Sequence, residues 1–173
     1  MSQEPHQLAE EGKRAFADGR FAEAARLFEQ AAEGFGLGRD GLNAAEMRNN
    51  LSVALLQDKK PQQALDAAAG TDKIFEAASD TKRQAMALGN QAAALDALGR
   101  LDEALALYER AAELFSKVHE GDLRSMVLKS AAAIRLRQGK VTESAMKMLG
   151  SLDAVEKPTL FQRILKFILR LRS

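Results

Sequence analysis

The stretch LGNQAAALDALGRLDEALALYERAAELF, residues 88–115, decides the fold. Small residues stand at fixed spacing on both sides of Gly99, as two closely packed helices require, because larger side chains would push the helix axes apart. Glycine ends a helix readily since it accepts a positive φ, and the basic Arg100 is favoured beside the terminal carbonyl groups. The stretch therefore predicts two antiparallel helices that are joined at Gly99.

This pattern recurs every 40 residues, four times and without slippage. Ala17–Glu33 matches Ala97–Glu113 without a gap, and weaker copies begin at Gln57 and Arg137. The four predicted helix stops are Gly19, Lys59, Gly99 and Gly139. First helices are expected near residues 4–18, 42–58, 80–98 and 121–138. Second helices are expected near residues 20–35, 61–78, 101–118 and 140–156.

Small residues hold three positions of the repeat, as close contact between paired helices requires. The position seven residues before each stop holds Gly12, Ser52, Ala92 and Ala132. The position five residues after it holds Ala24, Ala64, Ala104 and Ser144. The position twelve residues after it holds Ala31, Thr71, Ala111 and Ser151. Larger groups, Phe28, Tyr108 and Met148, are expected to fill the layer between repeats, and Ala68 leaves the second repeat thinner there.

This register resembles the tetratricopeptide-repeat family over roughly Pro5 to Glu156. The resemblance implies an all-α fold, a right-handed superhelical array of four antiparallel helix pairs. The repeats are expected at residues 4–40, 41–79, 80–120 and 121–157, within a domain of residues 1–158. The sequence departs from the family where a tryptophan is usual, since these positions hold Leu8, Arg48, Leu88 and Leu128. The fourth copy is atypical at Arg135 and Ser144.

Composition and spacing favour a protein without catalytic chemistry. The chain has no cysteine, which excludes disulfides and thiolate metal sites. Its two histidines, His6 and His119, have no metal-ligand or triad spacing. Residues before Thr159 carry a net charge of −3, from 21 basic and 24 acidic residues, which argues against nucleic-acid binding. We expect a non-enzyme with no cofactor and no metal.

A concave face lined by the first helices is the expected binding site. Asn50 and Asn90 stand 40 residues apart at one repeat position, and an amide there can bond to the backbone of an extended peptide. In the family that position often carries an asparagine that contacts peptide main chain. The alternative is that both amides make hydrogen bonds between helices. The other predicted groove residues are Asn49, Lys13, Glu10, Lys129 and Arg137.

The last fifteen residues, 159–173, form a separate basic segment with four basic and no acidic residues. Thr159 and Gln162 fit a capping box, which predicts a helix of its own. Its apolar residues cover an arc of about 200°, wider than a helix that only caps the array needs. The predicted surface residues of this helix are Phe161, Ile164, Phe167, Ile168, Arg163, Lys166 and Arg170. Three roles remain open: a cap on the array, a contact with a second subunit or partner, and a membrane surface.

Two functions follow from these features. The first is a non-catalytic scaffold or adaptor that binds a peptide or helix segment of a partner protein of unknown identity. The alternative is a membrane-associated or self-assembling scaffold that uses the C-terminal helix. No signal peptide and no run of about 18 apolar residues is present, so a cytoplasmic location is expected.

Overall fold

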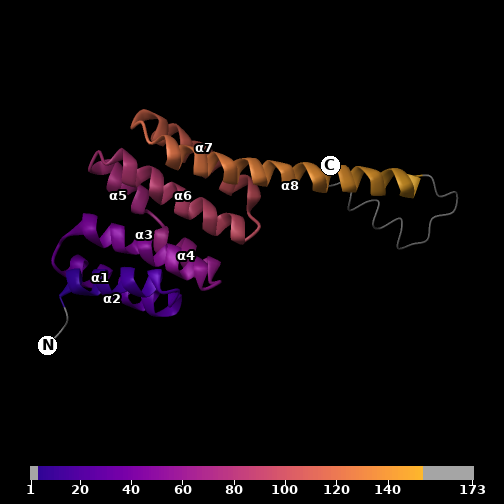
Figure 1. The fold of residues 1–173 in the computed structure, drawn as a ribbon. Coiled ribbons are helices and arrows are strands. Elements are labelled where there is room, and N and C mark those ends of the chain that lie inside the picture. The colour runs from indigo at the N-terminus through magenta and orange to yellow at the C-terminus, as the bar shows by residue number, and fades with distance from the viewer. Residues whose placement is uncertain (1–3, 154–173) are drawn as a thin grey trace. The chain divides into compact units, whose positions relative to one another are not determined.

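The structure, a computed structural model, describes the backbone of residues 4–153 and the side chains of residues 4–139. These residues form helices and no strand, which confirms the predicted all-α class (Figure 1). The right-handed superhelix stays a prediction. The helices are α1 (Pro5–Ala17), α2 (Phe21–Leu37), α3 (Gly41–Gln57), α4 (Pro61–Ala68), α5 (Thr71–Ala77), α6 (Thr81–Ala97), α7 (Leu101–Lys117) and α8 (Gly121–Asp153).

The chain divides into two units, residues 1–131 and 132–173, and the boundary lies within α8. Within the first unit α1 to α4 pack in succession, α5 to α7 do the same, and α3 and α6 contact each other directly. The layers follow one another from α1 and α2 to α6 and α7 (Figure 1). First and second helices therefore alternate as the 40-residue repeat predicts.

Turns of three residues end the helices at 20-residue intervals. The middle residue of each turn has a positive φ, between 58° and 76°. These residues are Gly19, Arg39, Lys59, Ser79, Gly99 and His119. The predicted stops at Gly19, Lys59 and Gly99 are thus confirmed, and the turns between repeats have the same form. Only two of the six residues are glycine, although the left-handed conformation is costly for other residues.

One backbone hydrogen bond closes each of these turns. The amide after the turn residue donates to the carbonyl five residues earlier, the pattern of a Schellman motif. The N···O distance is 2.9 Å from Arg100 to Leu95 and 3.0 Å from Glu120 to Phe115. Each accepting carbonyl belongs to a buried apolar residue, and these anchors are Ala15, Phe35, Leu55, Phe75, Leu95 and Phe115. Every turn is therefore fastened to the core by its anchor residue.

The predicted small positions are buried where the helices meet. Ala24, Ala31, Ala104 and Ala111 have no exposed surface. A Cβ atom added to Gly12 would lie 2.8 Å from the ring of Phe28, so the ring can pack against α1 only because residue 12 has no side chain. The expectation that small residues permit close helix contact is confirmed in the first three repeats.

The second helix of the second repeat differs from the prediction. A single helix was expected near residues 61–78, but the chain leaves the helix after Ala68 and restarts at Thr71. Gly70 has φ 75°, and the preceding Ala69 is extended with ψ 125°. A glycine inside a helical pattern lowers helix stability, and here it takes the left-handed conformation that breaks the helix.

The break leaves backbone carbonyl groups without a helical hydrogen-bond partner, and side chains from the first helices of two repeats bond to them. Arg48 of α3 donates from Nε to the Ala67 carbonyl at 3.1 Å and from Nη2 to the Ala69 carbonyl at 2.8 Å. Gln91 of α6 donates from Nε2 to the Ala68 carbonyl at 3.1 Å. The arginine that stands where the family has tryptophan therefore caps a broken helix.

The fourth repeat also differs from the prediction. A turn was expected at Gly139, but α8 runs without interruption from Gly121 to Asp153. Gly139 has no positive φ in this helix. The position that corresponds to the buried anchors holds Arg135, which is exposed. A turn at Gly139 would therefore lack the apolar anchor that fastens the other six.

Candidate partner-binding groove

A cavity of about 280 Å³ opens between α1, α2 and α3 on the side of the predicted groove residues. It brings together two of them, Lys13 from α1 and Asn50 from α3. The full lining is Lys13, Phe16, Phe28, Glu46, Asn50 and Val53. Two aromatic rings and Val53 give it apolar walls, and three polar side chains complete the lining. This is the composition of a site that holds an apolar side chain and orients it by a few polar contacts.

The charged residues of this cavity already have partners. Lys13 Nζ lies 2.7 Å from Glu10 Oε1, and the hydrogen bond from Lys13 holds the pKa of that carboxyl below its ordinary value. Glu46 Oε2 accepts from Arg83 Nη1 at 3.0 Å. Arg83 on α6 in turn lies over the ring of Phe75 on α5, 5.0 Å from its centroid. Positively and negatively charged side chains therefore both lie at the edge of the cavity.

Asn50 and Asn90 are half-buried and stand at equivalent positions of α3 and α6, two helices in contact. Among the hydrogen bonds of the described residues none involves either side-chain amide. The alternative expectation, hydrogen bonds between helices, is not met in this part of the chain. Asn90 does not line the 280 Å³ cavity, so only the first of the two amides borders it.

Asn49 is a buried structural residue and not part of the groove. Its side chain is 7% exposed, and its Oδ1 accepts from the Thr71 hydroxyl at 2.8 Å. The same hydroxyl lies 2.7 Å from the Ala68 carbonyl, so Asn49 belongs to the network that holds the broken helix together. Successive residues of a helix point about 100° apart, and one step along α3 turns the side chain from the groove to the interior.

The other predicted residues lie outside the cavity. Glu10 is exposed and does not line the cavity, although it bonds to Lys13, which does. Lys129 is exposed on α8, and Arg137 is exposed in the second unit. The predicted residues of the C-terminal helix, Phe161 to Arg170, lie outside the described part of the chain.

Two exposed methionines were not predicted as groove residues. Met86 on α6 is 42% exposed and Met126 on α8 is 58% exposed. Both stand at the repeat position of Glu46, which lines the cavity. Methionine adapts its shape to apolar partners, so the two methionines at this repeat position suit an apolar ligand. The 40-residue spacing of these three residues was the signal that could have identified them.

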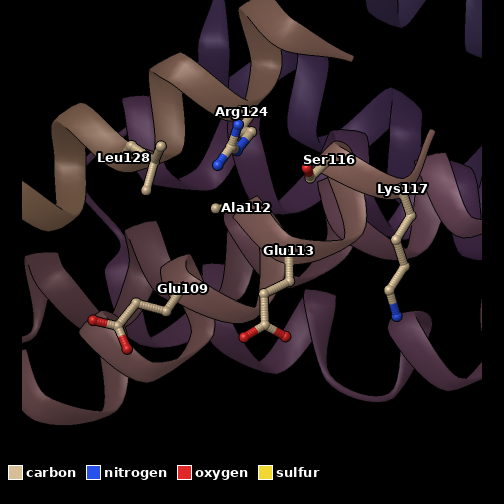
Figure 2. Close-up of a pocket in the computed structure, with 7 residues that line it drawn as sticks. All are labelled: Glu109, Ala112, Glu113, Ser116, Lys117, Arg124 and Leu128. Carbon is tan, nitrogen blue, oxygen red and sulfur yellow. The ribbon is translucent and has the colours of Figure 1, made fainter. Parts of the chain in front are cut away.

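A second hollow, of about 620 Å³, lies between α7 and the first turns of α8 (Figure 2). Figure 2 shows Arg124 and Leu128 on α8 facing Ala112 on α7. Its lining is Glu109, Ala112, Glu113, Ser116, Lys117, Arg124 and Leu128. We call it the α7–α8 groove. No residue of it was a sequence-based candidate.

The alternating helix pairs and their common turn define the chain as an all-α repeat protein. A family model described as tetratricopeptide repeat matches residues 83–149, which cover most of the predicted third and fourth repeats. This match confirms the predicted resemblance to the tetratricopeptide-repeat family over residues 83–149. Proteins of this family are generally non-catalytic scaffolds for protein–protein interaction. No curated protein matches the sequence.

Metal-binding groups and membrane-spanning helices are absent from the part of the chain that the structure describes. No group of three or more histidine, cysteine, aspartate or glutamate side chains there is placed to hold a metal ion. None of the described helices is both long and apolar enough to cross a membrane.

Proposed function

We propose that this chain is a scaffold that binds an extended segment of a partner protein along α1, α3 and α6. Asn50 and Asn90 would bond to the partner's backbone, and the cavity beside Asn50 would take one apolar side chain. One observation carries this proposal: two half-buried amides recur at one repeat position, and neither has a hydrogen-bond partner among the described residues.

The physical argument rests on what an amide can do there. A side-chain amide offers both a donor and an acceptor, which matches the alternating N–H and C=O groups of an extended backbone. Contacts of this kind recognise the shape of a peptide, while pockets for its side chains supply specificity. Phe16, Phe28 and Val53 give the pocket an apolar floor, and Lys13 and Glu46 lie at its edge.

The proposal is tested by replacing the two amides together. Asn50→Ala with Asn90→Ala should remove the partners that co-purify with the wild-type chain, while circular dichroism shows unchanged helix content. The control is Gln63→Ala, an exposed amide on the second helix α4. An unchanged partner set in the double variant would show that the groove is not the site.

A second test locates the partner directly. A photo-crosslinking residue at Val53, inside the cavity, should attach to partner peptides, whereas the same residue at Gln63 should not. Mass spectrometry of the attached peptides would then give the partner's sequence. Equal labelling from both positions would contradict a groove-specific contact.

The alternative function, a membrane-associated scaffold, stays a prediction because it depends on residues 159–173. Its motivation is their basic charge and the apolar arc of about 200°. Liposome co-sedimentation of the full chain and of a chain ending at residue 157 would decide. Equal sedimentation of both would remove the membrane role.

A further inference from the structure

The α7–α8 groove exposes a position that is buried in the first and third repeats. Leu8 and Leu88 are each 7% exposed, whereas Leu128, at the same repeat position, is 40% exposed. Gln84 is 8% exposed, whereas Arg124, its equivalent, is exposed. The first helix of the fourth repeat therefore exposes a leucine where the first helices of the first and third repeats bury one.

In the earlier repeats the covering element is the second helix of the same repeat. Leu8 belongs to one core cluster with Ala24, Leu27 and Phe28 of α2. In the third repeat α6 and α7 are in extensive contact in the same way. The natural occupant of the α7–α8 groove is thus a fourth second helix.

Residues 140–153 have the sequence of such a helix. Ser144 stands at the position of Ala24 and Ala104, which are fully buried. Met148 stands at the position of Phe28 and Tyr108, whose side chains are 3% and 6% exposed. The segment is helical, because it is the second half of α8.

This segment cannot fill its own groove while α8 is continuous. A helix that continues through Gly139 does not turn back there, and the anchor that would fasten such a turn is replaced by Arg135. Each chain then carries both an open groove and a helix that fits it. If two copies exchange this helix, each groove is filled by the helix of the other copy, and the result is a closed dimer.

We propose that two copies of this chain exchange residues 140–153, so that each segment packs as a helix into the α7–α8 groove of the other copy. The partner is a second copy of the chain. The contact is separate from the proposed peptide groove, so either proposal can fail without the other.

The first experiment measures the mass of the full chain by sedimentation equilibrium over a range of concentrations. We expect a monomer–dimer equilibrium for the wild type. Leu128→Glu should raise the dimer dissociation constant by about 30-fold or more, as loss of a central apolar contact does. The control Leu37→Glu alters a leucine that is 88% exposed at the other end of the array and should leave the constant unchanged. A wild-type chain that stays monomeric throughout would overturn the proposal.

The second experiment restores the missing anchor. Arg135→Leu should allow a turn at Gly139, fold residues 140–153 onto their own chain and shift the equilibrium towards monomer. Gly139→Ala should favour the continuous helix and preserve the dimer. If Arg135→Leu left the dimer as strong as in the wild type, exchange through an open turn would be contradicted.

The third experiment distinguishes exchange from closure within one chain and does not depend on a destabilising change. The chain has no cysteine, so single thiols can be placed without background. Ala132 and Met148 correspond to Gly12 and Phe28, which lie in direct contact. A mixture of Ala132→Cys chains and Met148→Cys chains, treated with a short bifunctional thiol reagent, should yield crosslinked heterodimers. If only a double-cysteine chain reacts, and reacts internally, residues 140–153 fold back on their own chain and the proposal is wrong.

Discussion

Six times between residues 19 and 119 the chain leaves a helix by the same three-residue turn, whereas at residue 139 the helix continues. Both regions offer the residues that are usually taken as the turn signal: Gly139 and Lys140 match Gly99 and Arg100. They differ in the anchor four residues before the turn residue. Leu95 is 4% exposed and Arg135 is exposed. Glycine is thus not sufficient for the turn, and the four turns without it show that it is not required.

The largest expected effect comes from removing an anchor. Phe115 is 1% exposed, and Phe115→Ala should lower the free energy of unfolding by about 3–5 kcal/mol, because it leaves a cavity beside the turn at His119. Urea denaturation followed by circular dichroism measures this. The control Leu37→Ala changes an exposed residue and should alter the free energy by less than about 0.5 kcal/mol. Equal losses from the two variants would refute the role given to the anchor.

The broken second helix gives the next largest effect, because one side chain, Arg48, bonds to two of its carbonyl groups. Arg48→Met keeps much of the side-chain length but removes the hydrogen bonds to the Ala67 and Ala69 carbonyls. We expect the free energy of unfolding to fall by about 2–3 kcal/mol, as for the loss of charged hydrogen bonds. Arg26→Met is the matched control, since within residues 4–139 the side chain of Arg26 bonds only to exposed Gln30 on its own helix. A loss no larger than in the control would mean that water satisfies these carbonyls equally well.

Two glycines at one repeat position should respond with opposite signs. Gly99 has φ 76°, so Gly99→Ala should lower the free energy of unfolding by about 1–2 kcal/mol. Gly139 lies inside α8, so Gly139→Ala should stabilise that helix by about 0.5–1 kcal/mol. Denaturation and amide hydrogen exchange across α8 measure the pair. Destabilisation by both would indicate that Gly139 also serves as a turn residue.

The smallest effect concerns the cap of α6 and depends on pH. Asp80 accepts from the Arg83 backbone amide at 2.9 Å, and this bond holds the pKa of the carboxyl below its ordinary value of 3.8. A pKa that is lower in the folded than in the unfolded state gives stability that is present above about pH 4. That stability is lost as the pH falls through the folded pKa. Asp80→Ala should cost about 1 kcal/mol at pH 7 and less at pH 2, as measured by urea denaturation.

Asp80→Asn serves as the control for this cap. Its side-chain oxygen can still accept from the Arg83 amide, so most of the stability at pH 7 should remain. Its dependence on pH should be weaker than in the wild type, because no carboxyl titrates at that position. A pH profile identical to that of the wild type would assign the acid sensitivity to other groups.

Prediction from the sequence was most successful where the packing of small residues determines how the helices pair. The 40-residue spacing of small residues and stops predicted the helix pairs of the first three repeats. The prediction missed the break at Gly70, because the repeat pattern was given more weight than the tendency of glycine to interrupt a helix. It also predicted a turn at Gly139, because glycine was weighted above the apolar anchor that Arg135 does not provide.

The candidate site was predicted in part for a related reason. Repeat spacing identified Lys13 and Asn50, and the structure places both at one cavity. It also suggested Asn49, which faces the interior because its amide bonds to Thr71 across the broken helix. The 100° step between successive helix residues could have shown that Asn49 and Asn50 face different sides, but its bond to Thr71 depends on a break that the sequence did not reveal.

The hydrogen bonds around residues 67–69 also determine where the array can be shortened. Gln91, which belongs to the third repeat, satisfies a carbonyl of the second. A fragment ending near residue 80 would lose this donor to the Ala68 carbonyl. Repeat arrays are often described as modules that are cut at any repeat boundary with a similar loss. In this chain a cut between the second and third repeats also removes a hydrogen bond that supports the broken helix, so we expect a larger loss of stability at this boundary.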